Sequence, residues 1–221
     1  MCTLYTLRLS AWEVRNLMQH YKLVGREWEE VIGARNDAQE FYPNYEAPVV
    51  VARGGQRTVE TMRWGFPPPP GVGSKAPVVN VRNTASAYWR PSIANKAQRC
   101  IVPATAFAEP DRNTSKPVVI RWFRRPAGEP FFFAGIWREW EGDRGTKAKP
   151  NVGRHKLYSF LTTAPNGIVE PIHNKAMPVL LMTPADVERW LEGSAEEALE
   201  LQKPPADDAI IMDLSLEKKA A

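Results

Sequence analysis

The segment FFFAGIW, Phe131–Trp137, is one of the short runs that decide the fold of this 221-residue chain. Runs of aromatic and β-branched residues bounded by glycine, proline or polar clusters are typical of β-strands. The same pattern recurs in Val49–Ala52, Thr58–Trp64, Val118–Phe123, Leu157–Thr163 and Val179–Met182. Because no internal repeat or interdomain linker separates these runs, they predict one α+β domain with a mostly antiparallel, barrel-like β core and a few peripheral helices.

Helices are predicted near the start of the chain. The segment Ser10–Glu13 (SAWE) matches a capping box and predicts a helix to about Tyr21, with Trp12, Leu17 and Met18 on its apolar face. A second short helix is predicted over Glu27–Ile32.

The C-terminal part has its own pattern. Thr183-Pro184 provides a cap and a first-turn proline for a helix that buries Trp190. An acidic helix is predicted over Ala195–Leu201, and Ala209–Leu214 is predicted to return as an edge strand.

Three further segments are predicted to lack regular structure. Phe41–Pro48 holds two prolines and an asparagine, and Gly142–Lys156 is polar and basic enough for a long hairpin loop. Pro67–Pro70 predicts a stiff, polyproline-like tip.

Charge is divided unevenly along the chain. Residues 1–183 carry 25 Lys/Arg and 15 Asp/Glu, whereas residues 184–221 carry 4 and 10. Within one domain, 1–221, we therefore distinguish a basic body, 1–183, from an acidic, helical C-terminal segment, 184–221, that packs on it. The basic body favours a polyanion as partner, although a basic surface that contacts only solvent has the same composition.

Composition also limits the class of protein. No run of about 18 apolar residues predicts a membrane helix, and the start of the chain lacks the pattern of a secretory signal. The two cysteines, Cys2 and Cys100, are too few for a disulfide framework. We expect a cytoplasmic monomer that makes no contact with a membrane.

Metal and nucleotide cofactors are not indicated. The three histidines, His20, His155 and His173, form no helical pair, and no Cys-x-x-Cys motif is present. Because the chain also lacks a glycine-rich phosphate loop, we expect no metal site and no cofactor.

Cys2 is the most informative residue. Its small side chain permits removal of Met1, which would leave a free α-amine beside a thiol. The reference pKa values are about 8 and 8.5, so both groups are partly nucleophilic near neutrality. Such a 1,2-aminothiol condenses with an aldehyde to an imine, and the thiol then closes a thiazolidine ring. An incidental cysteine at the second position is the alternative.

Two other titratable residues enter apolar surroundings. Glu109 ends the stretch ATAFAEP, and His173 precedes the apolar run from Met177. Carboxylates and histidines in such settings often have shifted pKa values and act as acid or base. Glu109 could instead pair with Arg99 or cap a turn, and His173 could be a core histidine.

Taken together, several segments resemble the SRAP family (SOS response-associated peptidase domain), also described as abasic-site processing proteins. The resemblance runs from Met1-Cys2 to about Met182, and no single piece of it is specific without the order and spacing of the others. Its pieces are Pro43–Tyr45, Ala47-Pro48, Arg63–Phe66, Asn80–Arg82, Arg99–Pro103, Phe107–Glu109, Ala134–Trp137, Leu161–Ala164, Ile172-His173 and Met177–Val179.

The resemblance implies covalent capture of an abasic site in single-stranded DNA by Cys2, which shields the lesion in the DNA damage response. Asn80 would orient the N-terminus, while Glu109 and His173 would transfer protons near the sugar. It also implies autoproteolytic loss of Met1, that is, protease, hydrolase and lyase-type chemistry, in a protein associated with the nucleoid when it is bound to DNA. For DNA contact it implies Arg82 at a phosphate and Trp64 against a base.

The chain departs from the family pattern around this site. It begins Cys2-Thr3-Leu4 where Cys-Gly-Arg is usual, so an arginine near the site is missing unless Arg8 replaces it. Ala108 and Pro110 stand on either side of Glu109, where aromatic residues are usual. The departures leave the affinity for DNA and the preference for a plain single strand or a junction open.

Two other functions stay open at this stage. An N-terminal nucleophile amidase acting on other substrates would hydrolyse an amide in trans. A non-catalytic nucleic-acid-binding protein would behave normally when Cys2 is replaced by alanine.

Overall fold

The computed structural model describes residues 2–24, 39–73, 76–114 and 118–219. The helix predicted over Glu27–Ile32 lies outside these residues. Among them, no helix has the length and apolar character needed to span a bilayer.

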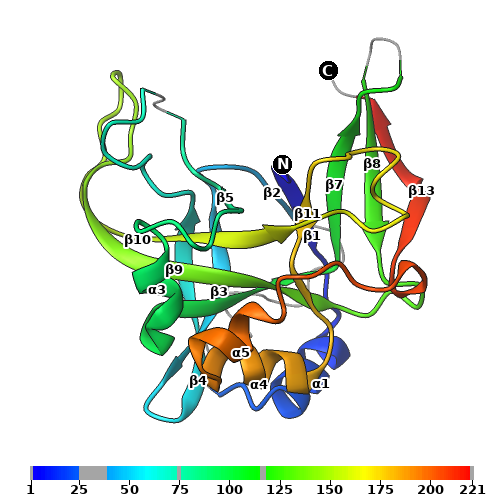
Figure 1. The fold of residues 1–221 in the computed structure, drawn as a ribbon, viewed down its shortest axis with the longest axis horizontal. Coiled ribbons are helices and arrows are strands. Elements are labelled where there is room, and N and C mark those ends of the chain that lie inside the picture. Colours follow the sequence, from blue (N-terminus) through cyan, green and yellow to red (C-terminus); the bar gives the residue numbers. More distant parts are fainter. Residues whose placement is uncertain (1, 25–38, 74–75, 115–117, 220–221) are drawn as a thin grey trace.

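The core of the fold is a ring of five strands. In ring order they are β10 (Val152–Thr163), β4 (Gln56–Trp64), β3 (Glu46–Arg53), β6 (Arg99–Ala104) and β9 (Phe131–Asp143). β9 pairs again with β10, which closes the ring into a barrel (Figure 1). Only the β10–β4 pairing in this ring is parallel, so the predicted barrel-like α+β fold is confirmed.

A second sheet, of five strands, packs against the barrel. Its order is β13 (Ile211–Lys219), β8 (Val119–Arg124), β7 (Ala106–Asp111), β1 (Leu4–Leu7) and β2 (Gln39–Phe41), all antiparallel. β13 is the edge strand predicted over Ala209–Leu214. Shorter strands complete the structure: β5 (Asn80–Val81) and β11 (Met177–Pro178) pair with β10, and β12 (Leu180–Leu181) pairs with β9.

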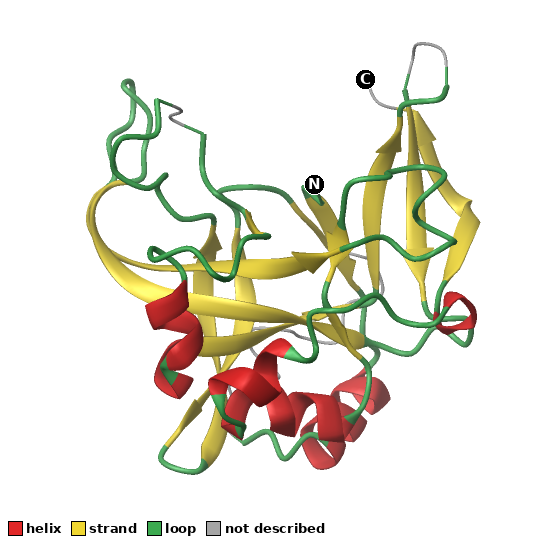
Figure 2. Ribbon diagram, in the orientation of Figure 1, coloured by secondary structure: helices red, strands yellow, loops and turns green. Residues whose placement is uncertain are grey.

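Helices α1 (Ala11–His20), α4 (Pro184–Glu192) and α5 (Ala195–Leu199) gather at the end of the molecule opposite the amino terminus (Figure 2). The capping box predicted at Ser10 and the cap predicted at Thr183 are both present, and Thr183 forms a capping box with Asp186 as well. Trp190 of α4 is fully buried, as predicted. Leu17 of α1 is buried, as predicted, together with Val14. Trp12 is 67% exposed, so its predicted place on the apolar face is wrong.

A short helix, α3 (Arg90–Ala94), and two 3-10 turns, Lys96–Gln98 and Asp207–Ala209, connect these elements. Two predicted loops are shorter than expected, because strands extend into them. β9 and β10 continue to Asp143 and from Val152, which leaves residues 144–151 as the hairpin loop. Within Phe41–Pro48, only the four-residue turn between β2 and β3 is irregular.

Aromatic side chains fill the space between the barrel and the second sheet. The ring of Tyr5 stacks on Phe41 at a centroid distance of 4.9 Å and meets Phe133 edge-on at 5.4 Å. Phe133 in turn contacts Phe160 at 4.5 Å. Burial of such rings is a major stabilising term. It also fixes β1, and with it the start of the chain, against the barrel.

Candidate active site at the amino terminus

The central position of β1 in the second sheet places Cys2 between two other strands. Leu4 lies opposite Ala108 of β7, and Tyr5 lies opposite Phe41 of β2. The chain that precedes β1 therefore passes the part of β7 that carries Glu109. Figure 1 shows the amino terminus between the β9–β10 hairpin on one side and the β7–β8 strands on the other.

Cys2 is fully buried in the chain that still carries Met1. Its thiol lies 3.4 Å from the carbonyl oxygen of Leu4. Burial, and after it the negative charge of Glu109, raise the pKa of the Cys2 thiol well above its ordinary value. The thiol is therefore protonated at neutral pH, and its sulfur is near enough to Glu109 for the two groups to influence each other.

Asn80 holds the main chain of Cys2. Its Nδ2 donates a 2.8 Å hydrogen bond to the carbonyl oxygen of Cys2. The residue is 7% exposed and is positioned by the pairing of β5 with Phe160 of β10. Its Oδ1 is buried and accepts no hydrogen bond from the described residues. Because a buried acceptor without a donor is costly, this oxygen is suited to a ligand's hydroxyl or amine.

Glu109 is a buried carboxylate beside the start of the chain. Burial raises the pKa of its side chain to about 7, against the opposing positive charges of the chain's amino terminus and of Arg112. A group with this pKa can both give and take a proton near neutrality. It does not pair with Arg99, whose guanidinium donates to the carbonyl oxygens of Ile93, Trp190 and Gly193.

His173 lies on the loop between β10 and β11. Its Nδ1 is 2.8 Å from the carbonyl oxygen of Ala176, which makes Nδ1 the protonated nitrogen and Nε2 the acceptor in the neutral ring. Burial lowers the pKa of His173, opposed by this hydrogen bond and assisted by the amino terminus, Arg112 and Lys175. The positive charges of the amino terminus and of Arg112 thus act on the pKa values of both His173 and Glu109.

A cavity of about 240 Å³ opens beside this site. Its lining includes His173, Lys175, Arg112 and Glu170. Two cations beside a buried histidine suit an anionic ligand such as a phosphate. Arg82 directly follows β5, two residues after Asn80, and its side chain is exposed.

Trp64 and Arg8, the two other residues predicted to contact DNA, lie in different surroundings. Trp64 has no exposed surface; its Nε1 donates to the carbonyl oxygen of Val79 at 3.0 Å, and its ring stacks on Phe160. A base cannot stack on a ring that the core already covers. Arg8 is exposed but follows the far end of β1, about 20 Å of extended chain from Cys2. The burial of Trp64 therefore contradicts its predicted stacking, whereas the prediction for Arg8 stays untested.

Two residues of the acidic segment, which sequence analysis missed, hold the loops of this site. Gln202 Nε2 donates to the carbonyl oxygens of Arg82 (3.0 Å) and Thr162 (2.9 Å), and its Oε1 accepts from Thr84 (2.9 Å). Asp207 accepts from the main-chain nitrogen of Gly167, on the loop that leads to His173, at 2.7 Å. Polar residues in a proline-rich stretch carry no local signal for such distant partners.

The model of the family described as SOS response associated peptidase (SRAP) matches residues 1–215. The chain belongs to the SRAP family. Relatives include the abasic site processing protein YoqW of Bacillus subtilis (strain 168), 27% identical over 75% of this chain and 76% of its own length. The abasic site processing protein YoaM of the same strain is 29% identical over 69% of this chain and 67% of its own.

Solved structures share the SRAP fold of this chain. A protein from Bordetella bronchiseptica has a TM-score of 0.71 at 23% identity, with both chains covered completely. One from Bacteroides thetaiotaomicron also has a TM-score of 0.71, at 19% identity, over 96% of this chain and 90% of that one.

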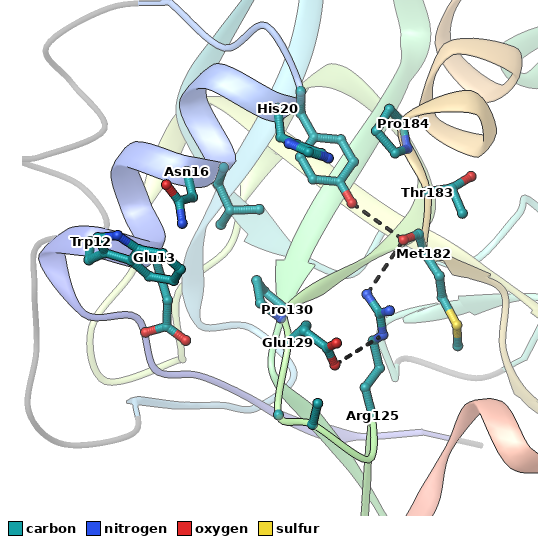
Figure 3. A pocket seen from close by; sticks show the side chains of 14 residues that line it. Trp12, Glu13, Asn16, His20, Arg125, Glu129, Pro130, Met182, Thr183 and Pro184 are labelled. Atoms are coloured by element: carbon teal, nitrogen blue, oxygen red, sulfur yellow. Dashed lines mark hydrogen bonds and ion pairs between the residues drawn. The ribbon is translucent and has the colours of Figure 1, made fainter.

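This SRAP chain has a second cavity, of about 460 Å³, at the opposite end of the molecule. Figure 3 shows it between α1 and the turn that joins β8 to β9. Some of its polar groups pair with one another: Tyr21 and Arg125 both donate to the carbonyl oxygen of Met182, and Arg125 pairs with Glu129 at 3.6 Å. The carboxylates and the histidine that line this larger cavity, Glu13, Glu129 and His20, are not buried.

Proposed function

We propose that this SRAP chain senses abasic sites in single-stranded DNA and forms a covalent crosslink to them through Cys2, once Met1 has been removed. The observation that carries the proposal is the position of Cys2, held by Asn80 and buried beside Glu109. The names of the relatives as abasic site processing proteins support the same chemistry. The crosslink would shield the lesion from strand breakage.

The α-amine acts first in this mechanism. The Cys2 thiol is kept protonated, whereas an α-amine with a pKa near 8 is partly neutral at pH 7. Its nitrogen attacks the C1′ aldehyde of the ring-opened sugar to give a carbinolamine, and loss of water leaves an imine. The sulfur then bonds to the imine carbon while its proton passes to the nitrogen, and the thiazolidine ring is closed.

Glu109 and His173 carry the protons of these steps. A carboxyl with a pKa near 7 can protonate the departing hydroxyl of the carbinolamine and can accept a proton from the attacking amine. Neutral His173, with Nε2 as acceptor, can take the proton of the sugar hydroxyl when the ring opens. The unpartnered Oδ1 of Asn80 accepts from the amine or the opened sugar.

The same site serves the removal of Met1 in this proposal. Glu109 takes the thiol proton of Cys2 as the sulfur attacks the carbonyl carbon of Met1, and it then gives that proton to the peptide nitrogen, which leaves as the α-amine when the carbon–nitrogen bond breaks. Water hydrolyses the resulting thioester, which releases methionine and regenerates the thiol. The α-amine needed for capture is then free.

The partner, in this proposal, is the DNA strand alone. Arg82, Arg112 and Lys175 surround the site and would contact phosphates on either side of the lesion. The net charge of +10 in residues 1–183 favours a polyanion. We propose a cytoplasmic monomer that associates with the nucleoid when it is bound to DNA.

The test is a denaturing gel of Met1-free protein with single-stranded DNA that carries one abasic site. Wild type, Cys2→Ala and Cys2→Ser are compared, with undamaged DNA as control. We expect a heat-stable shifted band that requires both the lesion and the Cys2 thiol. Protein that retains Met1 should give no band, and efficient crosslinking by it would refute the thiazolidine mechanism.

A further inference from the structure

The turn that joins β2 to β3 exposes two aromatic rings near Cys2. Within this turn, Tyr42–Tyr45, the side chains of Tyr42 and Tyr45 are 38% and 53% exposed. Their ring centroids are 5.5 Å apart and the ring planes are tilted by 59°. The two rings therefore lie next to each other with their faces at an angle and partly exposed. We refer to residues 42–45 as the tyrosine turn.

The backbone of the tyrosine turn is held rigidly. Tyr45 N donates to the carbonyl oxygen of Tyr42 at 3.0 Å, and Asn44 adopts the left-handed conformation that this turn requires. Two hydrogen bonds join the turn to the backbone of Trp64. The Trp64 carbonyl oxygen accepts from Asn44 N, and the Trp64 N–H donates to the carbonyl oxygen of Tyr45, both at 2.9 Å. The hydroxyl of Tyr42 donates to Glu40 at 2.7 Å, which fixes that ring.

The register of the second sheet places the tyrosine turn beside Cys2. β2 runs antiparallel to β1 with Phe41 opposite Tyr5. The chain that leaves β2 therefore passes the residues that precede β1, so that Tyr42 lies level with Leu4 and the turn lies beside Cys2. Figure 1 shows the β2 end of the sheet next to the amino terminus.

The tip of the β9–β10 hairpin brings positive charge to the same place. Arg144 donates through Nη2 to Oδ1 of Asn44 and to the carbonyl oxygen of Gly65. It forms no ion pair within the described part of the chain. Lys147 and Lys149 follow it on the exposed tip of the hairpin. The tyrosine turn is thus bordered by cations that are available to phosphates.

We propose that the tyrosine turn is the platform on which the base next to the abasic site stacks, with Arg144 and the hairpin lysines at the neighbouring phosphates. This inference rests on the proposed function. At the lesion itself no base is present, so the strand must be held through its neighbours. Trp64 is covered by the core and Ala108 has no ring, whereas aromatic rings beside cations are the usual means of holding single strands.

The platform is tested by equilibrium binding, separately from the covalent step. The probe is labelled single-stranded DNA with a tetrahydrofuran in place of the abasic sugar, which has no aldehyde to react. Fluorescence anisotropy gives Kd for wild type, Tyr45→Ala, Tyr42→Ala/Tyr45→Ala and the matching double phenylalanine variant. Trp12→Ala is the control, because Trp12 is an exposed aromatic at the opposite end of the molecule.

We expect Kd to rise about tenfold for each stacked base that is lost. The double phenylalanine variant should bind like wild type, because the rings remain. A second probe that also lacks the base next to the tetrahydrofuran should weaken wild type by the same factor and leave the double alanine variant unchanged.

Each outcome has a separate meaning. Equal Kd values for wild type and the double alanine variant on the first probe would refute the platform, as would no binding by wild type. Ring-dependent binding by a wild-type protein that forms no crosslink on the denaturing gel would support the platform and refute covalent capture.

Discussion

The two ends of the molecule differ in what they bury. Near the amino terminus, His173 lines a cavity of about 240 Å³, and three titratable groups, Cys2, Glu109 and His173, are each 7% exposed or less. At the α1 end, a cavity of about 460 Å³ is lined by polar groups that pair with one another and by an exposed tryptophan. The comparison shows that buried titratable side chains distinguish the candidate site from the other end of the molecule, whereas the volume of the cavity does not.

The largest effect should come from the proton-transfer residue at the amino terminus. Glu109→Gln should lower the rate of crosslinking by about 10²–10⁴-fold, because the amide can neither give nor take the proton. Glu13→Gln is the matched change at the α1 cavity; it can keep the capping box and should leave the rate unchanged. Single-turnover kinetics on abasic DNA measure both. Equal rates for the two variants would contradict the comparison.

The same substitution should stabilise the folded protein in a way that depends on pH. The pKa of Glu109 is raised to about 7 in the folded state, so the folded protein binds the extra proton between pH 4.5 and 7. Wild type therefore loses stability as pH rises through this window, whereas Glu109→Gln does not. The variant should be more stable by about 2–3 kcal/mol at pH 8 and about equal at pH 4. Urea unfolding at both pH values checks this, and a difference independent of pH would contradict it.

A smaller effect on stability and on crosslinking is expected from the acidic segment, whose Gln202 bonds to loops of the site. Gln202→Ala removes hydrogen bonds to Arg82, Thr84 and Thr162, and should cost about 1–3 kcal/mol of stability. Displacement of Asn80 should also slow crosslinking about tenfold, since small misplacements of a site are costly. Gln19→Ala, an exposed glutamine of α1, should change neither the rate nor the stability. A loss of stability with no loss of rate would make Gln202 purely structural.

The smallest effect should come from the exposed aromatic at the α1 cavity. Trp12→Ala should change the free energy of unfolding by less than about 0.5 kcal/mol and leave the crosslinking rate unaltered, because the ring is 67% exposed. Thermal unfolding and the gel assay are sufficient. A large loss of capture would show that the two ends of the molecule cooperate.

Sequence patterns predicted the parts of the fold that depend on neighbours along the chain. The helix caps at Ser10 and Thr183 are local, and the β-runs are bounded by local signals, so both are confirmed with shifts of a few residues. The ring closure through β9 and β10 depends on register, which the patterns do not contain.

The sequence allowed a candidate site to be proposed where a residue's own chemistry marks it, as at Cys2 and Glu109, and their roles stay predictions. The site was not predictable where position depends on tertiary structure. Trp64 follows the partly exposed Arg63 in β4. Because side chains alternate along a strand, the indole of Trp64 points into the core. Arg8 is six residues from Cys2 in sequence, but the intervening strand β1 carries it to the other end of that strand. Gln202 acts through partners at least 39 positions away, and no local pattern marks it.

The most direct test of the central claim is peptide mapping of the crosslinked protein by mass spectrometry. After nuclease digestion, iodoacetamide treatment under denaturing conditions and trypsin, the account predicts the sugar remnant on the peptide Cys2–Arg8, which begins at Cys2 and carries no alkylated thiol, while Cys100 is alkylated. Both nucleophiles of Cys2 would then be engaged in one ring. A remnant on a lysine, or on a peptide that still begins with Met1, would contradict the account.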